Sequence, residues 1–240
     1  MSISIAILAG GLATRLHPIT QTIPKAMIEI CGKPFLEHQI QLFKSQGFTE
    51  IVVLTGYLSN MIEEYFGDGS KFGIHIQYSY DGDKLLGTGG ALQKALPLLS
   101  ENFIVIYGDS YLSVPYSPIV EFYLNHTTGT KKQSQPEPLA LMTVYKNADL
   151  YDKSNVVFQN GILVDYNKKQ KRQDMEYIDW GLGIINQSAF SAYQNIEVFD
   201  LAELYQSLLP KKQLIGYEVF QRFYEIGSFD GLNEIEKILV

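Results

Sequence analysis

The sequence has a single cysteine, Cys31, so it forms no internal disulfide and lacks the companion thiols of a cysteine-based zinc site. No apolar run approaches the roughly 20 residues that a membrane-spanning helix needs. The N-terminus carries no basic segment before its apolar residues, and a glycine pair interrupts those residues early, which argues against a secretory signal peptide. These absences predict a cytoplasmic protein.

Positive charge is also scarce, because 19 Lys and Arg stand against 26 Asp and Glu, for a net charge of −7. A basic field of the kind that holds nucleic acid or an anionic membrane surface is therefore excluded, and neither is an expected partner. The composition is otherwise that of a globular protein, with 46% hydrophobic residues. The 240 residues suffice for one large α/β domain or two small ones.

Short aliphatic runs alternate with segments of helical period through the first half of the chain. The predicted strands are 3–9, 50–56, 73–80 and 102–109, and the predicted helices are 35–47, 58–67 (capped by Ser59) and 88–99. This order is the signature of a mostly parallel sheet with helices on both faces. Sheets of this kind bind ligands at the carboxyl ends of their strands.

The second half has a less regular pattern. Residues 126–138 are polar and rich in turn formers, which predicts a surface loop, and 139–146 reads as a further strand. Residues 156–168 predict a hairpin that turns at Asn160-Gly161, 177–185 predicts an extended run, and the last forty residues predict mainly helix. Without repeats or low-complexity tracts, the prediction is one continuous domain over residues 1–240.

The stretch LAGGLATRL follows directly on the first predicted strand. Glycines there let backbone N–H groups approach an anion without a Cβ in the way, although for an isolated glycine pair a tight strand-to-helix turn is the simpler explanation. The motifs GxxxxGK[ST] and GxGxxG are absent, which disfavours a P-loop NTPase and a standard dinucleotide fold. Arg15 lies four residues past Gly11, and Lys25 follows Pro24. Two cations near a glycine loop favour a polyphosphate, because guanidinium and ammonium neutralise different oxygens.

The longer stretch LAGGLATRLHPITQTIPKAM resembles the signature of the sugar-1-phosphate nucleotidyltransferases, A-G-G/A-x-G-T-R-L followed by P-K-P/A-M, with Ala13 where glycine is usual. The resemblance continues through GKPFLEHQIQLFKSQGFTEIVVLTGY, YFGDGSKFGIHIQYS, LLGTGGALQKAL and YGDSYL, so it covers residues 3 to about 112 densely. The chain looks most like the short members, which are heptose-1-phosphate and mannose-1-phosphate guanylyltransferases and N-acetylmuramate-1-phosphate uridylyltransferases.

The resemblance implies a Rossmann-like α/β fold with a mixed, mostly parallel sheet flanked by helices and without a C-terminal β-helix. It implies a nucleotide-binding half at about 1–112 and a sugar-binding half at about 139–240. The implied partners are a nucleoside triphosphate and a sugar 1-phosphate, which give a nucleotide sugar and pyrophosphate. A monomer and a homodimer are both open.

In this family a glycine loop and two cations hold the nucleotide, so the resemblance implies roles for each. Gly10, Gly11 and Thr14 would hold the triphosphate, Arg15 would stabilise the departing phosphates, and Lys25 the α-phosphoryl group. The positions expected to bind the nucleotide are Leu8, Ala9, Gly10, Gly11, Thr14, Arg15, Lys25, Asp81, Leu86, Gly87 and Thr88.

Asp109 ends the strand-like run FIVIYGD, where an aspartate is often only a turn former or a helix cap. The resemblance makes the Gly108-Asp109 pair the carrier of a Mg²⁺ ligand. Magnesium takes few carboxylates together with phosphate oxygens, so one further acid is expected. The stretch FYEIGSFDGL matches the family's late D-I-G motif and offers Glu225 in place of Asp. The expected cofactor is Mg²⁺, with Mn²⁺ as a substitute.

The base pocket is expected at LLGTGGA and at Asp81, which falls near the position where short relatives often carry an acid. A carboxylate suits guanine, since N1–H and the exocyclic amine are adjacent donors, whereas uracil offers one. The pattern leans towards GTP without excluding UTP or CTP. The segment YGDSY also resembles the N-G-D-S of the heptose enzymes, with Tyr107 in place of asparagine.

The sugar half departs furthest from the family pattern. Asn155 stands near a position usually held by glycine, the glutamate of E-K-P is missing, and Asp179-Trp180-Gly181 replaces N-A/T-G. Trp180 offers a face to a sugar ring or fills the core. Lys168 or Lys169 takes the sugar phosphate, or either is simply a solvated lysine of the hairpin. The positions expected to bind the sugar phosphate are Asn155, Lys168, Lys169, Asp179 and Gly181.

Two rival functions remain. A dehydrogenase is suggested by GTGGA alone, but its glycine spacing is wrong and it does not open the first β-α-β unit. A non-catalytic sensor of sugar nucleotides is the other, and against it the phosphate-binding positions and Asp109 hold competent residues.

Overall fold

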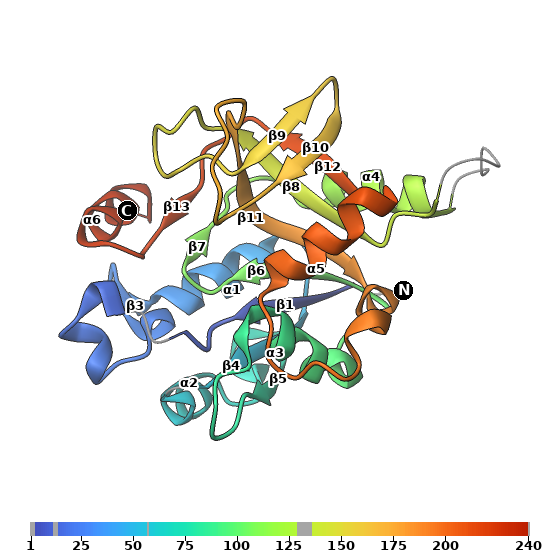
Figure 1. Cartoon of the computed structure of the whole chain (residues 1–240). Helices are drawn as coiled ribbons and strands as arrows, with labels where there is room; N and C mark the ends of the chain where they lie inside the picture. Colours follow the sequence, from blue (N-terminus) through green and yellow to red (C-terminus); the bar gives the residue numbers. More distant parts are fainter. Residues whose placement is uncertain (1–2, 12–13, 57, 129–135, 240) are drawn as a thin grey trace.

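The computed structural model describes residues 3–11, 14–56, 58–128 and 136–239. Within these residues a nine-stranded sheet runs in the order β10-β9-β11-β6-β1-β4-β5, with β8 beside β11 and β12 beside β8 (Figure 1). Its strands are β1 (Ser4–Leu8), β4 (Glu50–Thr55), β5 (His75–Tyr80), β6 (Asn102–Tyr107), β8 (Ala140–Lys146), β9 (Val156–Gln159), β10 (Ile162–Tyr166), β11 (Tyr177–Asn186) and β12 (Leu214–Val219).

The sheet is parallel through the first half of the chain and mixed beyond it. β1 pairs in parallel with β4 and β6, and β4 with β5, so the carboxyl ends of these four strands meet at one edge. β11 runs antiparallel to β6 and to β8, while β12 pairs in parallel with β8. The predicted mixed, mostly parallel sheet is confirmed, and the strands of the first half of the chain form its parallel part.

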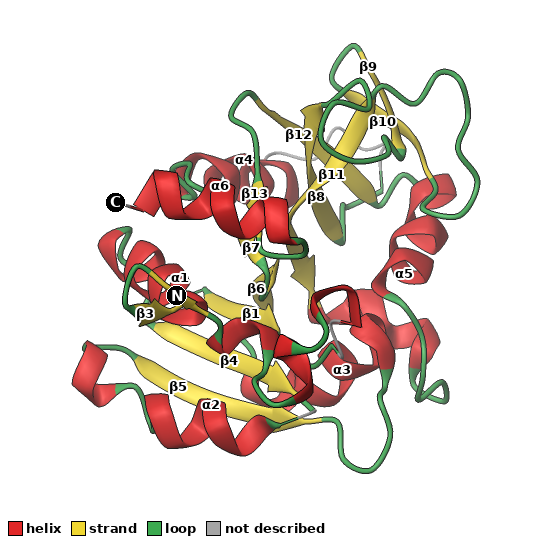
Figure 2. Cartoon of the chain, turned by 90° about the vertical axis from the view of Figure 1, so that its left-hand side faces the viewer, coloured by secondary structure: helices red, strands yellow, loops and turns green. Residues whose placement is uncertain are grey.

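Helices cover both faces of the sheet because successive strand residues point to opposite sides. Ile5 and Ile7 of β1 pack with α1 (Phe35–Ser45), α2 (Ser59–Phe66) and α4 (Ser117–Thr128), and Ala6 faces α3 (Gly87–Ala95) and α5 (Leu201–Leu208). Figure 2 shows α3 and α5 on one side and α1 and α4 on the other. None of the helices in the described part of the chain is long and apolar enough to cross a membrane.

The C-terminal helix returns to the N-terminal segment. A small ladder pairs β7 (Ser110–Tyr111) with β13 (Tyr224–Glu225), and α6 (Phe229–Leu239) follows it. Ile235 of α6 packs with buried residues that precede α1, which are Leu16, Ile28 and Ile30 beside the hairpin of β2 (Glu29–Ile30) and β3 (Lys33–Pro34). The C-terminal helix α6 therefore packs against the segment between β1 and α1.

Most expected elements are present, and the hairpin turn at Asn160-Gly161 is confirmed between β9 and β10. Ser59 is not a cap: Leu58 occupies the N-cap position with φ 57°, and no side chain caps the helix. The predicted loop 126–138 begins too early because α4 extends to Thr128; residues 129–135 of that loop lie outside the described residues.

The last forty residues are less helical than expected, because β12 runs through them as a strand of the main sheet. Leu214, Gly216 and Val219 are buried and the three residues between them are half-buried, so the run shows no strict alternation. A six-residue run of that kind fits a short helix about as well as a strand until its partner β8 is known. Pairing with β8 therefore makes this segment a strand.

Candidate active site

A pocket of about 230 Å³ opens at the carboxyl edge of the parallel strands. It brings together most positions predicted to bind the nucleotide and adds the ends of β4 and β6. Its lining consists of Leu8, Ala9, Gly10, Gly11, Lys25, Ala26, Leu54, Asp81, Leu85, Gly87, Thr88, Ala91, Tyr107, Gly108 and Asp109. The lining combines apolar side chains with the charged groups of Lys25, Asp81 and Asp109, which suits a ligand that has both a base and phosphates.

Two glycines allow three loops to converge at this edge. A Cβ on Gly108 would lie 2.9 Å from the carbonyl oxygen of Leu8, and one on Gly10 would lie 3.3 Å from the backbone nitrogen of Gly56. A side chain at either place would push the loops apart. Gly11, by contrast, has open space where its Cβ would stand, so its backbone is accessible from the pocket.

Asp81 follows β5, and its carboxylate lies beside Gly10 and Gly56. Burial raises the pKa of this carboxyl, while a long hydrogen bond of 3.4 Å from the backbone N–H of Leu86 and the charge of Lys94 oppose the rise. Leu86 itself is buried and does not line the pocket. Its backbone N–H donates to Asp81 Oδ2 and its carbonyl accepts the Phe199 N–H at 3.1 Å, so its contact with the nucleotide stays a prediction.

Gly87 and Thr88 open helix α3 at the pocket wall. The Thr88 hydroxyl accepts a hydrogen bond of 2.8 Å from the backbone N–H of Leu201, the first residue of α5. This contact joins the base side of the pocket to a helix from the second half of the chain.

Lys25 and Asp109 form an ion pair at 2.7 Å between Nζ and Oδ2. Lys25 begins a short 3₁₀ helix, Lys25–Met27, directly after Pro24, and Asp109 follows the end of β6. Both side chains are largely buried, at 16% and 27% exposure, which strengthens their attraction relative to a surface pair. Two of the predicted catalytic groups therefore meet.

A buried glutamine holds the segment that carries Asp109. The side-chain amide of Gln39, on α1, donates to the carbonyl oxygens of Tyr107 at 3.0 Å and Ser110 at 2.7 Å. Gln39 is 1% exposed. Gln39 is not among the residues predicted from the sequence, where the available signal is a glutamine on the apolar face of a helix, between Leu36 and Phe43.

Glu225 reaches Asp109 through the small ladder, in which Glu225 lies opposite Ser110 and Ile226 N–H donates to the Asp109 carbonyl at 2.9 Å. Burial and then the charge of Asp109 raise the pKa of the Glu225 carboxyl, and the cations Arg15 and Lys25 oppose this. The two predicted metal ligands are therefore neighbours from distant parts of the sequence.

These two carboxylates suit a magnesium ion, which prefers hard oxygen donors and keeps positions for water and phosphate. Within the described residues no group of three or more His, Cys, Asp or Glu forms a denser ligand cluster. A cation held by these carboxylates would offset the charge of Asp109, which after burial is the second cause of the raised pKa of Glu225. When bound, such an ion would neutralise phosphate oxygens.

Arg15 lies on the Glu225 side of the site and does not line the pocket. A Cβ on Gly227 would lie 3.2 Å from one of its guanidinium nitrogens, so the side chain extends along the segment after β13. Thr14 begins the 3₁₀ helix Thr14–Leu16, and Ala13 lies outside the described residues. Of the two cations predicted to bind phosphate, Lys25 therefore lines the pocket, and Arg15 lies outside its lining, close to Glu225.

Four of the five predicted sugar-phosphate positions also come together. Asn155 Oδ1 accepts the backbone N–H of Asp179 at 2.9 Å, and Asp179 Oδ1 accepts the N–H of Gly181 at 3.1 Å. Lys168 Nζ donates to the Tyr107 hydroxyl at 3.0 Å. Lys168 and Lys169 are both exposed, but the backbone N–H of Lys169 donates to Asn167 Oδ1 in the turn, and among the described residues its side chain has no hydrogen bond to this cluster. Lys168 is therefore the lysine at this cluster.

The charges of Lys168 and Asp179 stabilise each other. Burial raises the pKa of the Asp179 carboxyl, and Lys168 acts against that rise. Desolvation lowers the pKa of Lys168, but Tyr107 and Asp179 outweigh it, so the pKa lies above its ordinary value. Lys168 is thus held as a cation beside the pocket wall.

Trp180 belongs to the core. It is 2% exposed, and its indole N–H donates to the carbonyl of Gln221 at 2.8 Å. The suggestion that it offers a face to a sugar ring is wrong, because alternate residues of β11 point to opposite faces and this one points inward.

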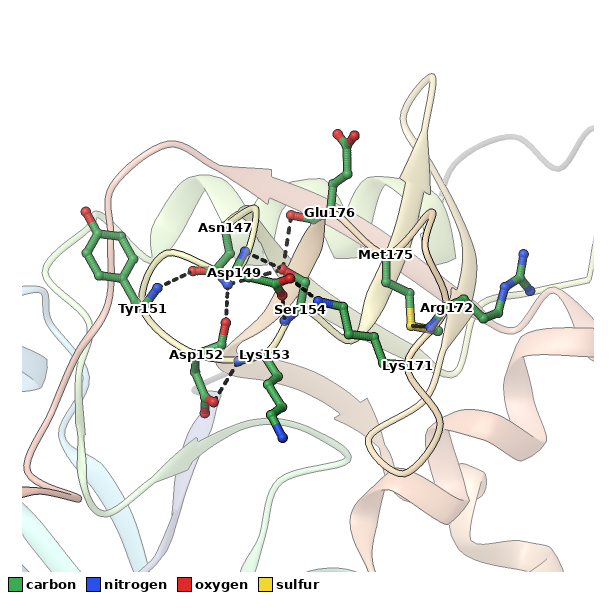
Figure 3. A network of polar contacts seen from close by, with 10 residues as sticks. All are labelled: Asn147, Asp149, Tyr151, Asp152, Lys153, Ser154, Lys171, Arg172, Met175 and Glu176. Atoms are coloured by element: carbon green, nitrogen blue, oxygen red, sulfur yellow. Dashed lines mark hydrogen bonds and ion pairs between the residues drawn. The ribbon is translucent and has the colours of Figure 1, made fainter.

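A hydrogen-bonded loop precedes Asn155 (Figure 3). Buried Asn147 donates to the Asp152 carbonyl at 2.6 Å and to Ser154 Oγ at 3.2 Å, while Asp149 accepts the Ser154 N–H at 2.8 Å and pairs with Lys171. These hydrogen bonds hold the loop of residues 147–154 in place, and the loop positions Asn155 beside Asp179.

A family model described as "Nucleotidyl transferase" matches residues 5–147. The chain belongs to this family, whose matched part carries the glycine loop, Lys25 and Asp109.

Two relatives and one solved structure resemble the chain closely. A D-glycero-alpha-D-manno-heptose 1-phosphate guanylyltransferase from Campylobacter jejuni is 29% identical over 221 residues, which cover 92% of this chain and 93% of the relative. A UTP–glucose-1-phosphate uridylyltransferase from Synechocystis is 38% identical over 128 residues, which cover 49% of this chain and 33% of the relative. The chain thus spans nearly all of one relative and a third of the other.

The crystal structure of HddC from Yersinia pseudotuberculosis complexed with GMP-PN superposes with a TM-score of 0.78 at 23% identity, covering 99% of this chain and 100% of that one. This likeness shows the fold, which is the Rossmann-like fold of nucleotidyltransferases.

Proposed function

We propose that the protein transfers a nucleotidyl group from a nucleoside triphosphate to a sugar 1-phosphate, releasing pyrophosphate. The observation that carries the proposal is the meeting of the glycine loop with the Lys25–Asp109 pair and Glu225 at one pocket edge. A phosphate oxygen of the sugar attacks the α-phosphorus, and the bond from that phosphorus to the bridging oxygen of pyrophosphate breaks. Such a reaction needs chiefly position and charge neutralisation.

Each half of the site has a part in this reaction. The backbone at Gly10 and Gly11 holds the triphosphate, Lys25 neutralises the α-phosphoryl group, and Arg15 the leaving phosphates. Asp109 and Glu225 would hold Mg²⁺, and the Asn155–Asp179 cluster with Lys168 takes the sugar 1-phosphate.

GTP is the favoured triphosphate, with a heptose or mannose 1-phosphate as acceptor. Three findings support this: Asp81 lines the pocket, the Campylobacter relative of nearly equal length is named a guanylyltransferase, and HddC was solved with GMP-PN. UTP or CTP with another sugar 1-phosphate is the second choice, since the Synechocystis relative is named for UTP.

The test is a matrix of four triphosphates against several sugar 1-phosphates with Mg²⁺, read by pyrophosphate release. Release with one GTP pair at a rate well above the others supports the proposal. Turnover with UTP or CTP alone would move the base preference to the second choice. Binding of sugar nucleotides without pyrophosphate release from any pair would replace the proposal by the non-catalytic sensor.

A further inference from the structure

Tyr107 belongs to both parts of the site. It is the last residue of β6, and it lines the nucleotide pocket with Gly108 and Asp109. Its ring also lies against Gly181, whose Cβ position is 3.7 Å from Tyr107 Cδ2. This side chain therefore forms the wall between the nucleotide pocket and the cluster of Asn155 and Asp179.

The hydroxyl of Tyr107 accepts the hydrogen bond from Lys168 Nζ, so its own proton is left to donate elsewhere. A phenol keeps that proton at neutral pH. An ammonium carries three donors, and one of them goes to Tyr107. Within the described part of the chain, no hydrogen-bond acceptor is found for the phenol proton or for the other two ammonium donors.

The surroundings do not neutralise Lys168 through a close ion pair in the described residues, although Asp179 and Asp200 act on it through their charges. The Asp179 carboxylate accepts a hydrogen bond from the N–H of Gly181 and, at 3.4 Å, one from the hydroxyl of Tyr166. The Lys168 ammonium and the Tyr107 hydroxyl therefore lie side by side, each with a proton to donate. An anion with several oxygens can accept hydrogen bonds from both.

We propose that Tyr107 is a substrate-binding residue, whose hydroxyl donates to a phosphate oxygen of the sugar 1-phosphate that Lys168 attracts by charge. The inference rests on the proposed function and adds a residue to it. An asparagine, which the resemblance makes usual here, ends several bond lengths closer to its Cα and would not reach Lys168. The tyrosine is therefore a feature of this chain that ties acceptor binding to the end of β6.

The test compares steady-state kinetics of the parent, Tyr107→Phe and a matched control, Tyr123→Phe. Tyr123 is buried, and its hydroxyl donates to Asn102 Oδ1 at 3.3 Å, at the other end of the same strand. Tyr107→Phe keeps the ring and loses only the hydroxyl. We expect its KM for the sugar 1-phosphate to rise about tenfold, as for a lost hydrogen bond to a charged group. Its KM for the triphosphate should stay within about twofold.

Tyr123→Phe should change neither KM, and the melting temperature of Tyr107→Phe should match the parent. An unchanged KM for the sugar 1-phosphate in Tyr107→Phe, or an equal rise for the triphosphate, overturns the assignment while the proposed function stands. A parent that releases pyrophosphate with no pair in the matrix overturns the proposed function and this assignment with it.

Discussion

Lys25 Nζ lies 2.7 Å from Asp109 Oδ2, so the cation expected to meet the α-phosphoryl group is paired with the carboxylate expected to hold the metal. Both side chains are mostly buried, and neither charge is left alone in the pocket. A phosphate would compete with Asp109 for the ammonium of Lys25, and a metal ion would compete with Lys25 for the carboxylate of Asp109. Binding of triphosphate and of metal are therefore expected to assist each other.

Replacing Lys25 with methionine keeps much of the stem and removes the cation. We expect turnover to fall by a factor of at least about 10², because charge stabilisation at the reacting phosphate is lost. Without triphosphate, the same variant should bind Mn²⁺ more tightly than the parent, since Asp109 no longer has a competing partner. Steady-state kinetics and a Mn²⁺ titration measure the two effects, and equal or weaker Mn²⁺ binding would contradict the competition.

Arg15→Ala should lower turnover at least about tenfold, since a charge on the leaving phosphates is lost. Arg15 is exposed, so the melting temperature should stay close to that of the parent. Calorimetry beside the rate measurement separates the two effects. Normal turnover would remove Arg15 from the leaving-group role.

The metal pair is tested at Glu225, where the family's usual residue is aspartate. Activity should require a divalent cation, and Mn²⁺ should replace Mg²⁺ because it takes the same oxygen ligands. Asp109→Asn should be nearly inactive at any Mg²⁺ concentration. Glu225→Gln should need several-fold more Mg²⁺ for half-maximal activity, and Glu225→Asp should keep appreciable activity. Parent-like behaviour of Glu225→Gln at limiting Mg²⁺ would place the second ligand elsewhere.

Asp81 is tested through the ratio of GTP to UTP use. Asp81→Asn replaces one of two acceptors with a donor, which should weaken GTP use more than UTP use, by about tenfold or more in kcat/KM. Competition between the two triphosphates at fixed sugar 1-phosphate gives the ratio directly. If the ratio of GTP to UTP use does not change, Asp81 does not contribute to recognition of the base.

Gln39 is expected to position Asp109 by holding the backbone on both sides of it, at Tyr107 and Ser110. Gln39→Leu removes both hydrogen bonds to the Tyr107 and Ser110 carbonyls and leaves two buried acceptors unpaired, at a cost of about 1–3 kcal/mol each. Mn²⁺ affinity should fall together with stability. Gln46→Leu is the matched control: it loses a bond to the Val114 carbonyl at 3.1 Å and one from the Tyr116 N–H, which lie five and seven residues beyond Asp109 rather than on either side of it. Its Mn²⁺ affinity should match the parent.

Much of the first half could be predicted from local sequence. Aliphatic runs of strand length alternate there with segments of helical period, and parallel pairing then follows from the crossover rule. The glycine loop, Lys25 and Asp109 could be brought to one edge on that basis, because carboxyl ends of parallel strands meet. The extended run at Leu214–Val219 could not be assigned, since only its partner β8 makes it a strand.

What tertiary structure alone decided is which side chains meet across long separations in the chain. The ladder of β7 and β13 places Glu225 beside Asp109, and the turn after β10 directs Lys168 rather than Lys169 to Tyr107. Trp180 faces the core, and Gln39 reaches two carbonyls near the proposed metal ligand. Local periodicity reports which residues are buried or form a helix, but the partner of a side chain depends on strand register and packing between distant segments, which no short stretch of sequence contains.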